Sequence, residues 1–217
     1  MTRPRATRGD HLRRALAQEA ARIMFEHGVA EYGFAKRKAA ERLGAGEHAV
    51  LPKNSEIEAA LAEYQRLFAH ESHAQTLIQQ RHAALAAMEL LHEFQPRLVG
   101  AVLAGTATPH QAIELHLFSD SVEAVSIKLI DGQIKYKLAE HRVRLTADHT
   151  LTYAMVQFVI QELPIHATIF PCDGIRQAPL SPVDGRPMRR ATAADVEQII
   201  QSVATTDSDW ISGPSMS

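Results

Sequence analysis

The stretch RLVGAVLAGTATPHQAIELHLFSD, from Arg97 to Asp120, decides the fold of this 217-residue chain. An apolar run over residues 98–104 predicts a first strand, which ends at the pair Gly105-Thr106. A short polar loop follows, and residues 112–118 then alternate between apolar and polar side chains, as a strand with one buried face does. The stretch therefore predicts two strands joined through a glycine turn.

The second predicted strand sorts its side chains onto two faces. Ile113, Leu115 and Leu117 are spaced two apart and would point into a core. Glu114 and His116 would then stand on the opposite face, the one available for chemistry. An ordinary half-exposed strand shows the same alternation, so the pair alone does not define a site.

Composition bounds the class of protein. Apolar residues make up 46% and charged residues 22%, and the formal charge of −2 gives no general attraction to nucleic acid or to an anionic membrane. The single Cys172 excludes an internal disulfide and fits a reducing compartment. No apolar run reaches the roughly 18–20 residues that span a bilayer, and no apolar signal core follows the basic N-terminus. These features predict a soluble, cytoplasmic protein.

The first half of the chain predicts a helical module over residues 10–95, with residues 1–9 disordered. Apolar residues recur at helical spacing in four segments. The capping-box pattern Ser55-x-x-Glu58 opens the third helix, and Pro96 follows the fourth. The segments are residues 10–27, 31–43, the helix after Ser55, and residues 73–94.

The string KAAERLG, residues 38–44, resembles a helix of a helix-turn-helix DNA reader. A recognition helix should follow after a short turn, but the sequence continues with a loop and a Glu-rich helix. An amphipathic helix with a basic solvent face is the favoured interpretation. Nucleic-acid binding by this half is an alternative that the sequence does not support.

The second half predicts an α+β domain over residues 96–204 with a mixed or antiparallel sheet. A helix begins near Asp120, and a last short helix begins at the capping pair Thr192-x-x-Asp195. A Pro- and Gly-rich loop precedes that helix, and residues 205–217 are expected to be a disordered tail. The further strands are predicted at residues 133–138, 142–146, 151–160 and 165–170.

VLAGTATPHQAIELHLFSDS resembles the signature of polymerase-beta-type nucleotidyltransferases, which is a strand, a Gly-Ser pair, a loop and an Asp-Ile-Asp-Leu strand. Gly105-Thr106 match the Gly-Ser pair, and Ile113-Glu114-Leu115 match the Ile-Asp-Leu core. A later strand of the family carries a third carboxylate, and the matching residue here is His166. The resemblance covers residues 98–170 and implies a nucleotidyltransferase-like fold.

The resemblance implies two-metal phosphoryl transfer, in which the Gly-Ser turn binds phosphate and three carboxylates hold two divalent cations. This sequence departs from that pattern at the ligands. Ala112 or His116 stands where a second carboxylate is expected, and His166 replaces the third. Glu114 is left as the one candidate catalytic carboxylate, which makes a poor Mg²⁺ site.

Three hypotheses follow. The domain has lost its chemistry and binds a nucleotide or phosphate ligand, which is the leading one. Alternatively, it is an active, divergent transferase that uses Mg²⁺ or Mn²⁺, with ligands drawn from elsewhere, such as Asp120 or Glu123. In the third, Glu114, His116 and His166 form a two-His-one-carboxylate site for a transition metal, which requires their strands to be adjacent and in register.

A second candidate site lies in the loop before the last helix. Arg186, Arg189 and Arg190 cluster near the helix start at Thr192, where arginines can bind phosphate; a solvated basic loop is the plainer interpretation. The competing function is a regulatory or interaction protein whose helical half binds a protein or nucleic acid. That function requires an exposed apolar or basic face on residues 30–70. The sequence predicts no oligomeric state.

Overall fold

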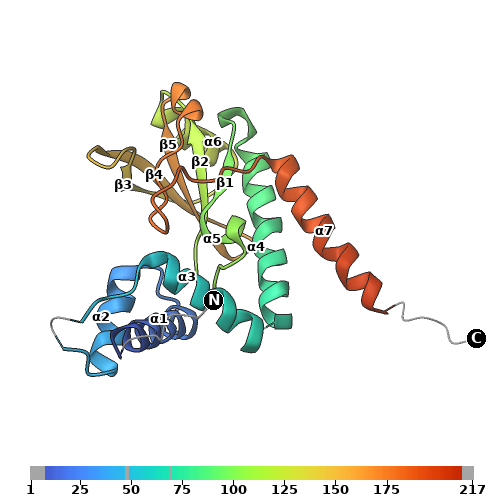
Figure 1. Ribbon diagram of the computed structural model, residues 1–217. Helices are drawn as coiled ribbons and strands as arrows, with labels where there is room; N and C mark the ends of the chain where they lie inside the picture. The colour runs from blue at the N-terminus through green and yellow to red at the C-terminus, as the bar shows by residue number, and fades with distance from the viewer. Residues whose placement is uncertain (1–7, 47–48, 69, 212–217) are drawn as a thin grey trace, which may run out of the picture. The chain divides into compact units, whose positions relative to one another are not determined.

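A computed structural model describes residues 8–46, 49–68 and 70–211 of this α+β protein (Figure 1). The chain forms two compact units. The helical unit comprises the described residues up to Thr76 together with 106–111 and 181–186, and the sheet unit comprises residues 77–105, 112–180 and those from Pro187 onward. Of the predicted disordered tails, residues 1–7 and 212–217 lie outside the described residues. The prediction is wrong for residues 8–9, which belong to the first helix, and for residues 205–211, which continue the last helix.

The helical unit is built on α1 (Arg8–His27), α2 (Tyr32–Arg42) and α3 (Asn54–Phe68). Helix α1 packs against both α2 and α3. Its buried positions recur every three to four residues, so one stripe of the helix faces the core. The buried core residues are Leu16, Ala17, Ala20, Ala21, Ile23, Met24, Ala35, Ala39, Ile57 and Leu61. The three helices predicted in this part of the chain are confirmed.

The start of α3 differs from the predicted capping box. The helix begins at Asn54, and the backbone N–H of Lys53 donates to the Glu56 carboxylate at 2.7 Å. Glu58 is therefore free for another use, and its carboxylate accepts hydrogen bonds from the hydroxyls of Tyr32 and Thr106. The predicted Ser55-x-x-Glu58 box is wrong, because the helix begins before Ser55 and the carboxylate that bonds back to the helix start belongs to Glu56.

The sheet unit contains one five-stranded mixed sheet in the order β1-β2-β5-β4-β3. Only the β2–β5 pair is parallel, and the other three pairs are antiparallel. The predicted mixed sheet is confirmed. The strands are β1 (Arg97–Val99), β2 (Ile113–Phe118), β3 (Tyr136–Arg144), β4 (Thr150–Ile160) and β5 (Leu163–Phe170).

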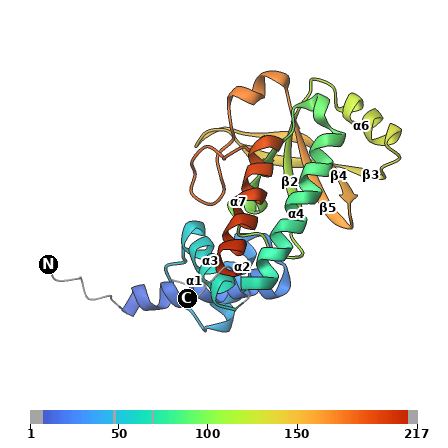
Figure 2. The same cartoon turned by 90° about the vertical axis from the view of Figure 1, so that its right-hand side faces the viewer.

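Helices connect and cover the strands. Figures 1 and 2 show α4 and α7 on one side of the sheet, and β1 is joined to the start of α7 through an isolated bridge between Leu98 and Ala191. None of the described helices is long and apolar enough to cross a membrane. The elements are α4 (His70–Leu90), a 3₁₀ turn (His92–Phe94), α5 (Gly100–Ala104), α6 (Val122–Asp131), a 3₁₀ turn (Cys172–Arg176) and α7 (Ala193–Ile211).

Two strand predictions are wrong. The apolar run 98–104 is a strand only as far as Val99, and the short helix α5 begins at Gly100. Short apolar runs fit a buried helix as well as a buried strand, so periodicity could not separate them. The predicted hairpin of 133–138 with 142–146 is one continuous strand, β3, and its antiparallel partner is β4.

Candidate functional site

One side of the sheet is apolar at its centre, and the other side combines polar side chains with a small buried cluster of Phe118, Val143 and Phe170. Ile113, Leu115 and Leu117 of β2 are fully buried on the apolar face, as predicted. Glu114 and His116 lie on the other side of β2. They share that side with His166 and Thr168, their direct neighbours on β5. We call this second side the polar face.

The parallel pairing of β2 with β5 places Glu114 directly opposite His166. Across the next two strands, His166 is paired with Gln157 of β4, and Gln157 is paired with Lys137 of β3. Directly opposed residues share a face. Lys137, Gln157, His166 and Glu114 therefore form one in-register line of polar side chains, which we call the polar row. The condition that the strands of Glu114 and His166 be adjacent and in register is met.

Gly100 lies against the carboxylate of Glu114. Its φ of +70° is in the left-handed region, and a Cβ atom there would come within 2.6 Å of a Glu114 carboxylate oxygen. Glycine is thus required at this position both for its backbone and for space. Burial raises the pKa of Glu114, which favours the protonated carboxyl. The glycine that borders the candidate carboxylate is therefore Gly100.

Gly105 and Thr106, the pair matched to a phosphate-binding turn, have other contacts. Gly105 ends α5 in the left-handed conformation, with φ +86°, which fits the plainer interpretation as a turn glycine. Thr106 is 8% exposed, and its hydroxyl donates to Glu58 of α3. Its carbonyl accepts from the Gln65 side chain at 2.9 Å. The Thr106 hydroxyl is thus engaged within the helical unit.

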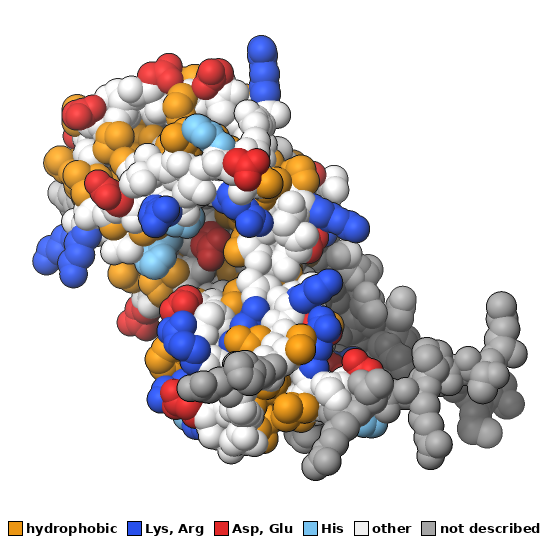
Figure 3. Space-filling model, turned by 60° about the vertical axis from the view of Figure 1, so that its left-hand side comes forward, with side chains coloured by type: hydrophobic (Ala, Val, Ile, Leu, Met, Phe, Trp, Pro, Cys, Tyr) orange, Lys and Arg blue, Asp and Glu red, His pale blue; other side chains and the backbone are white. Residues whose placement is uncertain are grey.

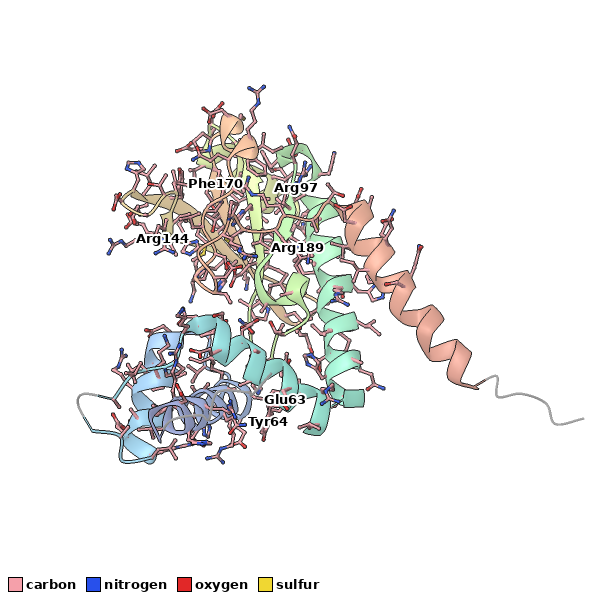
Figure 4. All side chains as sticks on the ribbon, in the orientation of Figure 1. Glu63, Tyr64, Arg97, Arg144, Phe170 and Arg189 are labelled. Atoms are coloured by element: carbon pink, nitrogen blue, oxygen red, sulfur yellow. The ribbon has the colours of Figure 1, made fainter. Side chains whose placement is uncertain are left out.

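Arg190 anchors the segment after β5 onto the polar face. Its Nε donates to Nδ1 of His116 at 3.1 Å, and its Nη1 donates to the carbonyls of Gly174 and Ile175 at 3.0 and 3.1 Å. The guanidinium also lies over the rings of Phe118 and Phe170, 5.0 and 5.4 Å from their centroids. Figure 4 shows Phe170 in place on the sheet.

Burial controls the charge of this group of side chains. Burial, reinforced by the charges of Arg190 and His141, lowers the pKa of His116 to about 3. His116 is therefore neutral near pH 7, as it must be for Nδ1 to accept from arginine. Burial and then repulsion from Arg97 lower the pKa of Arg190 to about 10. In the part of the chain described, Nη2 of Arg190 is buried with no hydrogen-bond partner.

A second histidine reaches across the polar face from β3. Nδ1 of His141 lies 2.9 Å from the hydroxyl oxygen of Thr168, and Thr168 is paired with His116 across β2 and β5. Burial, and then the charge of His166, lower the pKa of His141; burial also lowers the pKa of His166. The structure thus gathers three histidines, which favour the neutral form and can donate or accept hydrogen bonds.

The three predicted loop arginines do not gather at one place. Arg190 belongs to the sheet unit and contacts His116, whereas Arg186 belongs to the helical unit and its backbone N–H donates to Asp184. Arg189 is exposed. The predicted cap of α7 is confirmed, since Thr192 and Asp195 exchange hydrogen bonds at 2.8 and 3.2 Å. Phosphate binding by Arg186 and Arg189 stays a prediction.

The metal ligands predicted at Glu114, His116 and His166 share the polar face. Nevertheless, the described residues include no group of three or more His, Cys, Asp or Glu side chains arranged to hold a metal ion. The substitutes Asp120 and Glu123 have other contacts. Asp120 accepts from the Cys172 backbone N–H at 3.0 Å, and Glu123 accepts from the Ser121 hydroxyl at 3.0 Å. Metal binding stays a prediction.

Four polar-face residues were missed by sequence reasoning: Lys137, Gln157, His141 and Thr168. The only signal for them was strand alternation, which assigns residues to a face but not to a neighbour. The two predicted strands at 133–138 and 142–146 also interrupted β3, so Lys137 and His141 were not placed on one strand.

No family model, curated protein or solved structure matches the chain.

Proposed function

We propose that the polar face of the sheet binds a nucleotide or another phosphate ligand, on a divergent or inactive nucleotidyltransferase-like site. The observation that carries this proposal is the in-register pair of Glu114 and His166 on adjacent parallel strands. The sequence resemblance assigns these two positions to metal-binding carboxylates, and they lie side by side where that assignment requires it.

The charge of the polar face supports an anionic ligand. Glu114 is the one carboxylate among the described strand residues of this face, which also carries Lys137 and Arg97. Arg190 adds a half-buried guanidinium next to His116. Figure 3 shows histidine and basic side chains on the upper part of this view, with acidic side chains among them. Cationic side chains of this kind bind phosphate groups.

The small number of carboxylates on the polar face favours ligand binding over catalysis. Two-metal phosphoryl transfer needs several carboxylates. Here Ala112 and His166 occupy positions where the resemblance expects carboxylates. If the protein is an active, divergent transferase, Glu114 is the catalytic carboxylate. Its raised pKa weakens its use as an anionic metal ligand and suits a hydrogen-bond donor.

Thermal unfolding of the full chain tests the proposal. ATP, GTP, CTP and UTP are each added with Mg²⁺, Mn²⁺, Zn²⁺ or EDTA. A ligand at 100 times its Kd stabilises the folded state by about 2.7 kcal/mol, and we expect such a shift with at least one nucleotide. Glu114→Ala should abolish the shift, and Glu140→Ala, on the other face of β3, should retain it. No shift under any condition would overturn the proposal.

A second candidate function has its own observation. Residues 30–70 of the helical unit leave several large apolar side chains exposed, with Val50 at 67% and Leu67 at 57%; the others are Phe34, Leu43 and Leu51. This part of the chain would then bind a protein partner or nucleic acid. Fluorescence anisotropy with labelled RNA and DNA, over a salt series, tests the nucleic-acid version, in which affinity must fall steeply with salt. Salt-independent or absent binding would contradict it.

A further inference from the structure

The polar row crosses four neighbouring strands, and two of its members, Lys137 and Gln157, belong to no motif in the sequence. The register pairs Lys137 with Gln157, Gln157 with His166, and His166 with Glu114. Adjacent strands lie about 4.8 Å apart, so three steps make the row about 14 Å long. A single phosphate ion is too short to contact both ends.

Lys137 is the most exposed member of the polar row. Lys137, on the edge strand β3, is exposed, whereas Gln157, His166 and Glu114 are half-buried. Gly100 lies directly against the Glu114 carboxylate. The polar row is therefore accessible at Lys137 and enclosed at Glu114. The two ends differ, so a ligand that lies along the row would bind in one orientation.

We propose that the polar row binds a nucleoside triphosphate lengthwise, with the phosphates over Lys137 and His166, and that this binding needs no divalent cation. The inference rests on the proposed function. It adds to that function the orientation of the ligand and the groups that balance its charge.

The donor set of the polar row explains why a metal is not needed. Mg²⁺ is held by several hard oxygen ligands, but the row supplies one carboxylate, at the end far from the lysine. The lysine ammonium has three donors and binds phosphate as a point charge. Gln157 and His166 can each donate a hydrogen bond in addition. Lys137 thus takes the charge-balancing position that a metal ion occupies in a carboxylate-rich site.

Lys137 and Arg142 provide a matched pair of variants. Both are exposed cations on β3. Lys137 faces Gln157 on the polar face, whereas Arg142 is paired with Thr152 on the opposite face. Lys137→Ala and Arg142→Ala therefore remove the same charge from the same strand on different sides of the sheet.

Isothermal titration calorimetry of the full chain, with each of the four nucleoside triphosphates in Mg²⁺ and in EDTA, tests the inference. We expect one Kd in both buffers. Lys137→Ala should weaken binding by about tenfold or more, which is about 1.4 kcal/mol. Arg142→Ala should change Kd by less than about twofold, and Lys137→Arg should retain most of the affinity because the positive charge remains. Inorganic phosphate should bind much more weakly than the triphosphate.

Distinct results would overturn the inference. Binding that appears only with Mg²⁺ would contradict metal independence, and equal losses in Lys137→Ala and Arg142→Ala would show a general charge effect. Inorganic phosphate as tight as the triphosphate would contradict a lengthwise ligand. If the triphosphates bind normally to Lys137→Ala, this inference fails while the proposed function stands; if none binds to the unaltered protein, both fail.

Discussion

At the scale of single residues, Gly100 constrains the candidate carboxylate most tightly. Its φ is +70°, and an added Cβ would lie 2.6 Å from a Glu114 oxygen. Gly105 is the matched control, since its φ is +86° but its Cβ would meet only the Arg81 side chain at an ordinary 3.7 Å. We expect Gly105→Ala to cost about 1–2 kcal/mol for the backbone alone. Gly100→Ala should cost about 1–3 kcal/mol more, because Glu114 must move. Chemical denaturation measures both values, and equal costs would contradict the close packing.

Thr106 makes a prediction within the helical unit. Its buried hydroxyl donates to Glu58, which also accepts from Tyr32. Thr106→Val removes one donor from a partly buried carboxylate and should lower the free energy of unfolding by about 1–3 kcal/mol. Thr106→Ser keeps the hydroxyl and should remain close to the unaltered protein. Urea titrations compare the two variants. A loss of nucleotide binding in Thr106→Val, with stability unchanged, would instead favour the phosphate-binding role that the sequence resemblance implies.

His116 makes the stability of the sheet unit depend on pH. Its pKa is lowered to about 3 in the folded state, against about 6.5 in an unfolded chain. The unfolded state therefore binds more protons between these values, and stability is lost as pH falls below 6.5. His116 alone should reduce the free energy of unfolding by about 2 kcal/mol between pH 7 and pH 5. The pKa values of His141 and His166 are lowered too, so their contributions have the same sign.

Circular dichroism during denaturation at several pH values measures this dependence. The variant His116→Gln does not titrate, and its amide oxygen can accept from Arg190. Its stability should fall less steeply on acidification than that of the unaltered protein. Identical slopes in the two proteins would show that His116 does not hold a depressed pKa.

At the scale of elements, Arg190 joins the segment after β5 to the sheet. It bonds His116 and two backbone carbonyls and lies over two phenylalanine rings. Arg190→Ala should lower stability by about 2–3 kcal/mol, and hydrogen exchange should quicken at residues 172–176. Its exposed neighbour provides the control: Arg189→Ala should change stability by no more than about 0.5 kcal/mol. Similar effects of both substitutions would contradict the anchoring role.

Sequence periodicity predicted an element correctly where the residue pattern was compatible with only one type of secondary structure. The apolar stripe of α1 was predicted correctly, because burial of one face enforces its period. Strand β2 was also predicted correctly, but its burial does not alternate, since His116 and Phe118 on the second face are buried as well. The prediction for the run at 98–104 failed because a short apolar run fits a strand or a helix equally well. In the structure the strand ends at Val99 and a helix begins at Gly100. The break predicted inside β3 failed because its residues 137–142 are mostly exposed, which leaves no clear apolar alternation to follow.

At the scale of the whole molecule, the site depends on contacts between distant parts of the sequence. Glu114 and His166 were both candidates from the sequence, and the structure pairs them directly across β2 and β5. Lys137 and Gln157 could not be found in the same way, because strand order and register are set by tertiary packing and not by local pattern. Arg190 reached His116 across 74 residues, a contact that composition of the loop alone could not specify.

The NMR spectrum of the histidine side chains during a nucleotide titration tests most directly whether the polar face is the binding site. Each ring reports on its own surroundings, and the histidines lie in both units. We predict that the resonances of His166 shift most on addition of the nucleoside triphosphate, with smaller shifts for His141 and His116. The exposed His92 and His110 should stay unchanged. Saturable shifts confined to His27 or His110 of the helical unit, with His166 unmoved, would contradict the account.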